Sequence, residues 1–203
     1  MNPIIRSALL ASPLAALLLL SACVVPTGPV EVTRFNRAAE GIVYGSGSYT
    51  VVPSPAAKTG ETLALSPYLA AVAREMQRVG YSEKIDGSDV VVEVTVDTAR
   101  MEAAKQSPVS VGVGGSTGSY GSGVGVGVGI NLGSLGGSGA QVITTLRIRM
   151  LRRTDNVVIW EGRASQTAGA KSPAAQPGIA ASKLAAALFK IFPGESGTSS
   201  TVP

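Results

Sequence analysis

Three carboxylates on one predicted strand are the residues best placed to do chemistry. Asp89, Glu93 and Asp97 recur every four residues in a stretch that alternates apolar and polar side chains, so they share one face of a strand. Residues four apart along a strand are separated by about 13 Å, whereas the paired carboxylates of glycosidases lie roughly 5–9.5 Å apart. We therefore interpret them as a solvated face whose ion-pair partners are Arg147 and Arg149, on another predicted strand.

Histidine is absent from the 203 residues, and cysteine occurs once. The chain therefore has no Ser-His-Asp or Cys-His nucleophile pair, no thiolate metal cluster and no intramolecular disulfide. Serine–lysine chemistry stays formally open, but Ser66 is predicted to cap a helix. Ser182 and Lys183 are neighbours on a predicted helix and so do not face each other. We expect no catalytic residue, no metal site and no cofactor, which favours a non-enzymatic role.

The first 22 residues have the pattern of a secretory signal peptide. Arg6 provides the positive charge, and residues 8–20 form an apolar run shorter than the roughly 20 residues needed to span a bilayer. The run Leu20-Ser21-Ala22-Cys23 that follows resembles the bacterial lipobox. This resemblance implies cleavage between Ala22 and Cys23 and attachment of lipid to the Cys23 thiol. The alternative is an ordinary signal peptide cut near Ala22, which would leave a free thiol.

The predicted mature chain starts at Cys23 and is held at a membrane by its lipid. Two or more acyl chains give stable anchoring, where one chain is marginal. In Gram-negative lipoproteins with such a lipobox, aspartate after the cysteine favours the inner membrane, so Val24 indicates the periplasmic face of the outer membrane. Residues 23–29 then form the lipid anchor and a short tether, which reaches only roughly 20 Å at about 3.3 Å per residue.

Charge limits the class of partner. Without Arg6 the chain has 16 basic and 13 acidic residues, a net charge of +3, and its longest basic run is Arg152-Arg153. Such a chain has no nucleic-acid footprint. The expected partners are the membrane, through the lipid on Cys23, and an unknown envelope protein, with a homo-oligomer left open.

Hydrophobic patterning predicts one α+β domain over residues 30–193. Ser66-Pro67 is predicted to open a helix that ends at Gly80, a natural left-handed stop. The predicted strands are 30–35, 48–52, 89–98, 142–151 and 157–165, and a second helix is predicted at 178–192. We expect a mainly antiparallel sheet with two amphipathic helices packed on one face. The tail, residues 194–203, is expected to be disordered.

The same patterns assign some side chains to faces. Period-two alternation places Val158 and Trp160 together on one face of the last predicted strand. Helical spacing places Leu184, Leu188 and Ile191 on the apolar side of the second helix. These assignments predict that Trp160 is a core or edge anchor.

A glycine-rich insert interrupts the domain at residues 106–140. The part between Gly112 and Gly139 holds 13 of the 25 glycines, and it matches neither G-x-G-x-x-G nor a P-loop. Alternation of glycine with branched residues predicts a β-hairpin-like segment with one apolar face. That face, a possible interaction surface, is formed by Val124, Val126, Val128 and Ile130. The alternatives are a flexible excursion, a docking edge for a partner or another copy, and a membrane-inserting hairpin with a glycine inner face.

Several short motifs together resemble the bacterial lipoproteins grouped as domain of unknown function 4136. The resembling features are the lipobox, Met76-Gln77-Arg78-Val79-Gly80-Tyr81, Ser88-Asp89-Val90-Val91-Val92-Glu93-Val94, the glycine-rich insert, Val158-Ile159-Trp160-Glu161-Gly162 and Phe192-Pro193. The resemblance covers roughly residues 30–193. It implies a periplasm-facing α+β domain tethered to the outer membrane, and it brings no catalytic residue to transfer.

Three functions follow as hypotheses. The first is a non-enzymatic envelope lipoprotein that is anchored by Cys23 and acts by interaction, through a sheet edge or the glycine-rich hairpin. The second is a periplasmic module that binds a small ligand or lipid between helix and sheet, which would need an apolar cavity there. The third is a hydrolase that uses carboxylates alone, which would need a convergent acidic cleft.

Overall fold

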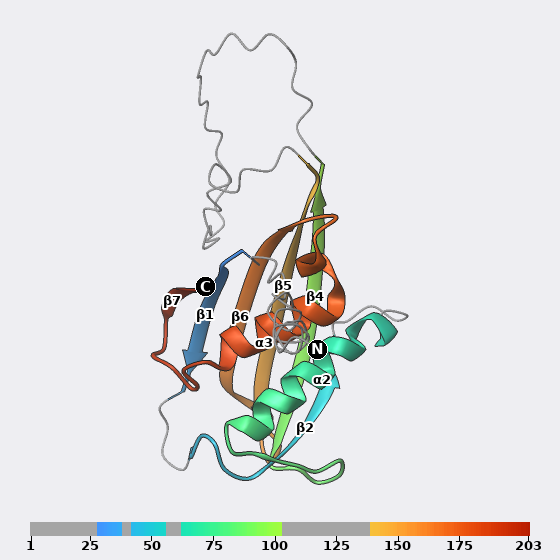
Figure 1. The fold of residues 1–203 in the computed structure, drawn as a ribbon. Coiled ribbons are helices and arrows are strands. Elements are labelled where there is room, and N and C mark those ends of the chain that lie inside the picture. Colours follow the sequence, from blue (N-terminus) through green and yellow to red (C-terminus); the bar gives the residue numbers. More distant parts are fainter. Residues whose placement is uncertain (1–27, 38–41, 56–61, 103–138) are drawn as a thin grey trace, which may run out of the picture.

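The computed structural model describes residues 28–37, 42–55, 62–102 and 139–203. These residues form seven strands and two α-helices, with one short 3-10 turn (Figure 1). In chain order the elements are β1 (Val30–Asn36), β2 (Ser48–Pro53), α2 (Thr62–Arg78), β3 (Ser82–Glu83), β4 (Val90–Met101), β5 (Gln141–Arg152), β6 (Val157–Gly169), η4 (Pro173–Ala175), α3 (Pro177–Phe189) and β7 (Thr198–Val202).

All seven strands belong to one sheet in the order β3-β2-β4-β5-β6-β1-β7. Neighbouring strands are antiparallel, except that β2 runs parallel to both β3 and β4. The predicted mainly antiparallel sheet is therefore confirmed. The first and last strands of the described chain, β1 and β7, lie side by side at one edge (Figure 1).

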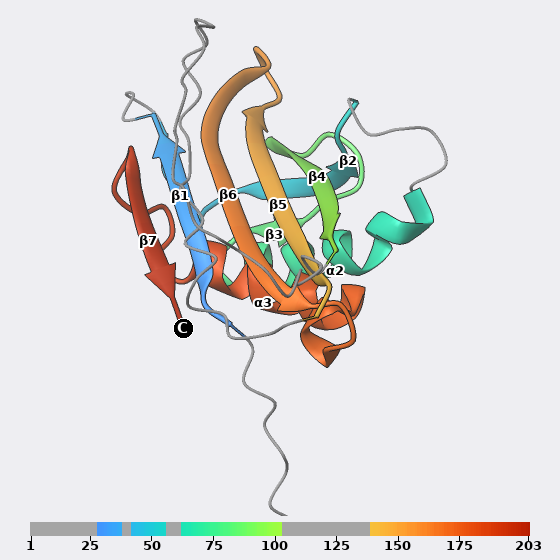
Figure 2. The ribbon, with the colours of Figure 1, turned by 90° about the horizontal axis from the view of Figure 1, so that it is seen from above.

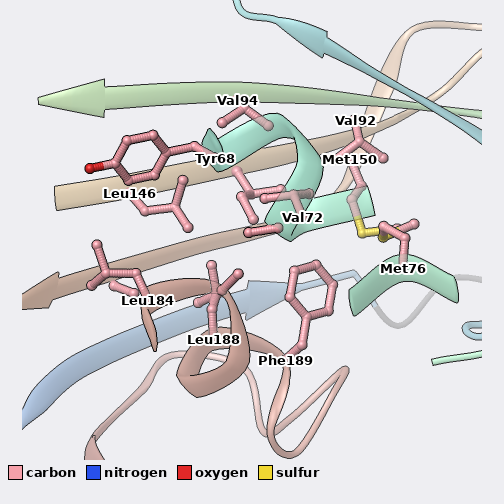
Figure 3. Packing of buried hydrophobic residues seen from close by; sticks show 14 of the residues in the cluster. Tyr68, Val72, Met76, Val92, Val94, Leu146, Met150, Leu184, Leu188 and Phe189 are labelled. Atoms are coloured by element: carbon pink, nitrogen blue, oxygen red, sulfur yellow. The ribbon is translucent and has the colours of Figure 1, made fainter. Parts of the chain in front are cut away.

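Both helices cover the same face of the sheet (Figure 2). The helix α3 contacts β1, β5 and β6, the helix α2 contacts β2 and β4, and the helices contact each other. Between helices and sheet lies a core of buried side chains (Figure 3). The labelled members of this core are Tyr68, Val72, Met76, Val92, Val94, Leu146, Met150, Leu184, Leu188 and Phe189. The structure thus has the expected α+β class, with two amphipathic helices packed on one face.

The helix α2 begins earlier than the sequence pattern indicates. It starts at Thr62, so Ser66 does not cap it and Pro67 lies inside it. The side chain of Leu65, the residue before Ser66, is buried. Because helices in proteins are stabilised mainly by burial of an apolar face, this burial favours helix N-terminal to the predicted cap. At the other end, Gly80 has a φ of 105°, so the predicted left-handed stop is confirmed.

A bulge at the start of β6 reverses one predicted facing. Trp160 pairs with Met150, but Val158 pairs with Leu151, which leaves Ile159 as an extra residue in β6. An extra residue shifts the alternation of faces, so Val158 and Trp160 lie on opposite faces of the sheet and not on one. Trp160 itself is fully buried, as expected of a core anchor.

The C-terminal region corrects two further predictions. The helix α3 ends at Phe189, so Ile191 lies beyond it and is 58% exposed instead of facing the core. Residues 194–203, which we expected to be disordered, include the strand β7, paired along its whole length with β1. Four of the five residues of β7 are polar, and only Val202 packs against the core, so backbone hydrogen bonds to β1 are the main interaction that holds this strand.

Two arginines satisfy the carbonyl groups at the end of α3. Arg34 of β1 is 1% exposed, and its Nε and Nη2 donate to the carbonyls of Leu188 and Ala187, each at 2.8 Å. Arg78 of α2 donates from Nη2 to the carbonyl of Phe189 at 2.9 Å. The last carbonyls of a helix lack partners within it and carry partial negative charge, so cations stabilise that end. The two side chains therefore tie β1 and α2 to α3.

Candidate functional site

The face of the sheet that carries no helix forms a hollow of about 450 Å³. Alternate side chains of β1, β4, β5 and β6 point to this side, because the intervening residues on the same strands are buried beneath the helices. We call this surface the open face. The hollow is lined by Thr33, Phe35, Ser54, Glu93, Thr95, Arg147, Ile148, Arg149, Glu161, Gly162 and Arg163.

The first row of side chains across the open face is fully ion-paired. Glu93 of β4, Arg149 of β5 and Glu161 of β6 lie opposite one another in the register of the strands. Arg149 donates from Nη1 to Oε2 of Glu93 and from Nε to Oε1 of Glu161, both at 3.1 Å. The predicted pairing of Glu93 with an arginine of the second strand is confirmed. One guanidinium pairs with both carboxylates in this row. The three side chains therefore form a network of ion pairs and not an acid–base pair.

The other two predicted carboxylates lie outside the hollow. Asp97 forms an ion pair with Arg147, which confirms the predicted partner. Asp89 instead accepts hydrogen bonds from the amide and hydroxyl of Ser48, at 2.8 and 2.6 Å. These hydrogen bonds from Ser48 lower the pKa of the Asp89 carboxyl below its usual value. The three carboxylates do not converge, so the geometry gives a carboxylate-only hydrolase no support.

The second row across the open face is Thr33, Arg163, Arg147 and Thr95, on β1, β6, β5 and β4. Its two arginines lie directly opposite each other on neighbouring strands. Arg147 is paired with Asp97, whereas the side chain of Arg163 makes no hydrogen bond or ion pair with any residue of the described ranges.

Two charged residues of the hollow, Glu161 and Arg163, were missed in the sequence reasoning. Only the apolar face of the predicted strand at residues 157–165 was assigned, and its polar face was given no role. The signal was available, because Glu161, Arg163 and Ser165 alternate with Gly162 and Ala164 as an exposed strand face does. The strand partner that gives Glu161 its arginine, however, appears only in the folded register.

The helix-covered face is filled by side chains where the structure describes it. Trp160 stacks with Phe189 at a ring-centroid distance of 5.5 Å, and Phe192 lies 5.4 Å from Trp160. The Trp160 Nε1–H donates to the carbonyl of Pro193 at 2.9 Å. Such packing fills the space around Trp160 with core side chains, and the second hypothesis, a ligand cavity between helix and sheet, stays a prediction.

The remaining predicted sites lie outside the described residues. These are the signal peptide 1–22, the cleavage and lipidation site at Ala22 and Cys23, and the interaction surface formed by Val124, Val126, Val128 and Ile130. In the ranges that are described, neither helix is long and apolar enough to cross a bilayer. Those ranges also contain no group of three His, Cys, Asp or Glu side chains placed to hold a metal ion.

Comparison with known proteins gives one family match. Residues 32–194 match the family described as "Domain of unknown function (DUF4136)". An uncharacterized protein of Zymomonas mobilis subsp. mobilis is 42% identical over 62 residues, which are 30% of this chain and 23% of that protein. The chain thus aligns with less than a quarter of that relative's length.

Solved structures give only low similarity. A PDZ domain protein from Parabacteroides distasonis ATCC 8503 has a TM-score of 0.49 and 11% identity, covering 86% of this chain and 39% of that one. The PelC dodecamer from Paraburkholderia phytofirmans has a TM-score of 0.40 and 12% identity, covering 79% of this chain and 94% of that one. Scores this low transfer no function.

Proposed function

We propose a function from two observations. This chain belongs to the DUF4136 family, which it matches over residues 32–194, and its sheet has the open face described above. The protein is a lipid-anchored lipoprotein of the cell envelope, at the periplasmic face of the outer membrane. It is not an enzyme, and it acts by binding another envelope protein through the open face. The observation that carries this proposal is the charged hollow across four strands, on a face that no helix covers.

The position of the first described residues supports an anchor near the domain. Lys183 of α3 donates from Nζ to the carbonyl of Gly28, just before β1. Gly28 is five positions after Cys23, so a tether between them reaches only about 17 Å at about 3.3 Å per residue. At the same end of the sheet lie Met101 and Gln141, paired neighbours that flank the glycine-rich insert. A lipid on Cys23 would therefore hold this end of the sheet close to the membrane, with the open face turned sideways.

The chemistry of the open face supports binding rather than catalysis. Its charged groups are arginines and glutamates that neutralise one another in part, and its apolar group is the ring of Phe35, which is 52% exposed. Arginine and aromatic side chains are enriched at protein interfaces. A surface of this composition suits a partner that brings complementary charge.

Labelled palmitate fed to intact cells tests the anchor. The wild-type chain is expected to incorporate the label, and the Cys23→Ser variant is expected to lose both the label and membrane association. Mass spectrometry of the N-terminal peptide gives the matched readout. A chain that begins near residue 23 with a free thiol would identify an ordinary signal peptide and contradict the lipoprotein.

A photocrosslinker placed at Phe35 tests the interaction role. Benzoylphenylalanine keeps an aromatic side chain at this position, and Ile85, which is 81% exposed outside the open face, is the matched control. We expect position 35 to yield a defined adduct with one envelope protein that position 85 does not yield. Equal capture from both positions, or none from position 35, would count against the open face as the binding surface.

A further inference from the structure

Every charged side chain in the first row of the open face is ion-paired, whereas one charged side chain of the second row is not. In the first row, Arg149 lies between two carboxylates and bonds to both. In the second row, Arg147 and Arg163 lie directly opposite each other, and a single carboxylate, Asp97, pairs with Arg147 from the β4 side. The second row therefore carries one guanidinium in excess of its acidic partners.

The residues opposite the two arginines on the outer strands of this row are threonines, and an aromatic ring lies close by. Thr33 lies opposite Arg163, and Thr95 lies opposite Arg147, so both ends of the row carry hydroxyl groups. Phe35 is two residues from Thr33 on β1, and its exposed ring lines the same hollow. Like charges directly opposite on neighbouring strands destabilise a sheet, and an anion placed between them removes this repulsion.

We propose that Arg163, assisted by Arg147, binds one oxyanion carried by an acidic segment of the partner protein. This proposal rests on the interaction role of the open face and names its chemistry: a carboxylate, with an apolar residue beside it that contacts Phe35. Arg163 is the principal group because its guanidinium has no partner among the described residues. Arg149 contributes little to it, since its donors already face Glu93 and Glu161.

Other charged groups face this row and set the limit on the charge it accepts. Glu161 lies next to Arg163 along β6, Asp97 lies next to Thr95 along β4, and Glu31 lies next to Thr33 along β1, all on the same face. These carboxylates would repel a second negative group close by. The site therefore suits a single oxyanion, and a densely charged ligand such as a nucleic acid is disfavoured.

Fluorescence anisotropy with the mature lipoprotein in a nonionic detergent tests the proposal. The probe is a peptide with capped ends and the core Asn-Phe-Asp that carries an uncharged dye, and its Asn-Phe-Asn counterpart is the control probe. We expect the acidic peptide to bind saturably, inorganic phosphate to displace it, and the amide peptide not to bind. Failure of the acidic peptide to bind more tightly than the amide peptide would overturn the proposal.

A matched pair of variants assigns the binding to the second row. Arg163→Gln is expected to weaken binding by about fivefold or more, the effect of losing one exposed ion pair of about 1 kcal/mol. Arg152→Gln removes an exposed arginine that is already paired with Asp155 at the far end of β5, and it should leave binding unchanged. Equal weakening by both variants would show nonspecific attraction to positive charge and would reject the site. Both positions are exposed or partly exposed, and matched thermal melts verify that both variants fold.

A vesicle-flotation experiment distinguishes an acidic protein segment from a lipid headgroup as the group that binds Arg163. Flotation is compared for vesicles of phosphatidylcholine alone and for vesicles with added phosphatidylglycerol, using the Cys23→Ser chain, expressed without residues 1–22 so that no lipid anchors it, with and without Arg163→Gln. Peptide binding with flotation that does not depend on Arg163 supports the acidic protein segment. Flotation that requires both phosphatidylglycerol and Arg163, without peptide binding, overturns it in favour of a lipid phosphate. Peptide binding is measured independently of the palmitate and crosslinking experiments. If the peptide does not bind, those two experiments still test the proposed anchor and the proposed binding surface.

Discussion

The two faces of the sheet are built from the same strands and have opposite physical characters. On the helix-covered face, β5 places Leu146, Ile148 and Met150, all buried. On the open face, the residues between them, Arg147 and Arg149, are exposed and form ion pairs. Burial of apolar surface is the main source of stability, whereas exposed ion pairs contribute little. The covered face therefore determines whether the domain folds, and the open face is free to be used for recognition.

The largest expected effect comes from truncating a side chain of the covered face. Phe189→Ala removes a fully buried ring that stacks on Trp160 and Phe192. We expect the free energy of unfolding to fall by about 3–5 kcal/mol, measured by urea denaturation. Ile191→Ala is the control two residues away, because its side chain is 58% exposed and should change stability by less than about 0.5 kcal/mol. Similar losses from both variants would contradict the assigned end of α3.

A smaller effect is expected from adding one methyl group beneath the helices. A Cβ atom on Gly162 would lie 2.4 Å from the Trp160 ring and 2.8 Å from Cδ1 of Leu188. Gly162→Ala should therefore cost about 1–3 kcal/mol of unfolding free energy through overpacking. In contrast, a Cβ on Gly178 in α3 meets nothing within 4 Å, so Gly178→Ala should be neutral or stabilising. A Gly162→Ala variant as stable as Gly178→Ala would show that this contact is not tight.

Removing an ion pair of the open face should have a still smaller effect. Glu161→Gln breaks the pair with Arg149, in which both side chains are nearly half exposed. We expect a loss of at most about 1 kcal/mol, reduced further in high salt. A double-mutant cycle with Arg149→Gln measures the coupling. A coupling energy several times this value would mean that the open face contributes to folding as much as the core does, and the comparison of the two faces would fail.

The smallest effect concerns an exposed carboxylate whose partner is not an arginine. The pKa of Asp89 is lowered in the folded state by its hydrogen bonds from Ser48. A carboxyl whose pKa is lower in the folded state than in the unfolded state stabilises the protein at pH values above the unfolded pKa of about 3.9. That stabilisation is lost as the pH falls from there through the folded pKa. Asp89→Asn should therefore lose slightly more stability at pH 7 than at pH 3, as measured by denaturant unfolding. A difference of the opposite sign would contradict the assigned hydrogen bonds.

Several parts of the fold and site are predictable because their cause is local. Alternation of valine with polar residues places Val92 and Val94 in the core and Glu93 on the open face. The left-handed stop at Gly80 follows from the freedom of glycine to adopt a positive φ. The arginine partner of Glu93 is predictable as well. The polar face of residues 89–98 is acidic and that of residues 142–151 is basic, and such faces form ion pairs when their strands are neighbours.

The remaining features depend on which distant segments meet. The extra residue Ile159 in β6 exists only relative to the register of β5, and a single-strand pattern contains no register. The strand β7 is polar and has no apolar periodicity, so only the open edge of β1 makes it a strand. Likewise, nothing in the sequence distinguishes Arg34 from other charged residues. Its role arises because the last turn of α3 packs against it, so that Arg34 donates to the carbonyls of that turn.

The sequence by itself determined the α+β class, most of the strand faces and the arginine partners of Glu93 and Asp97, because side-chain polarity and backbone period act over a few residues. It also contains the run Leu20-Ser21-Ala22-Cys23, and the proposed anchor rests on the resemblance of this run to a lipobox. Only the tertiary structure decided which arginine has no partner and which face stays open. Those properties arise from pairing between strands far apart in the chain, where register sets the neighbour of each charge.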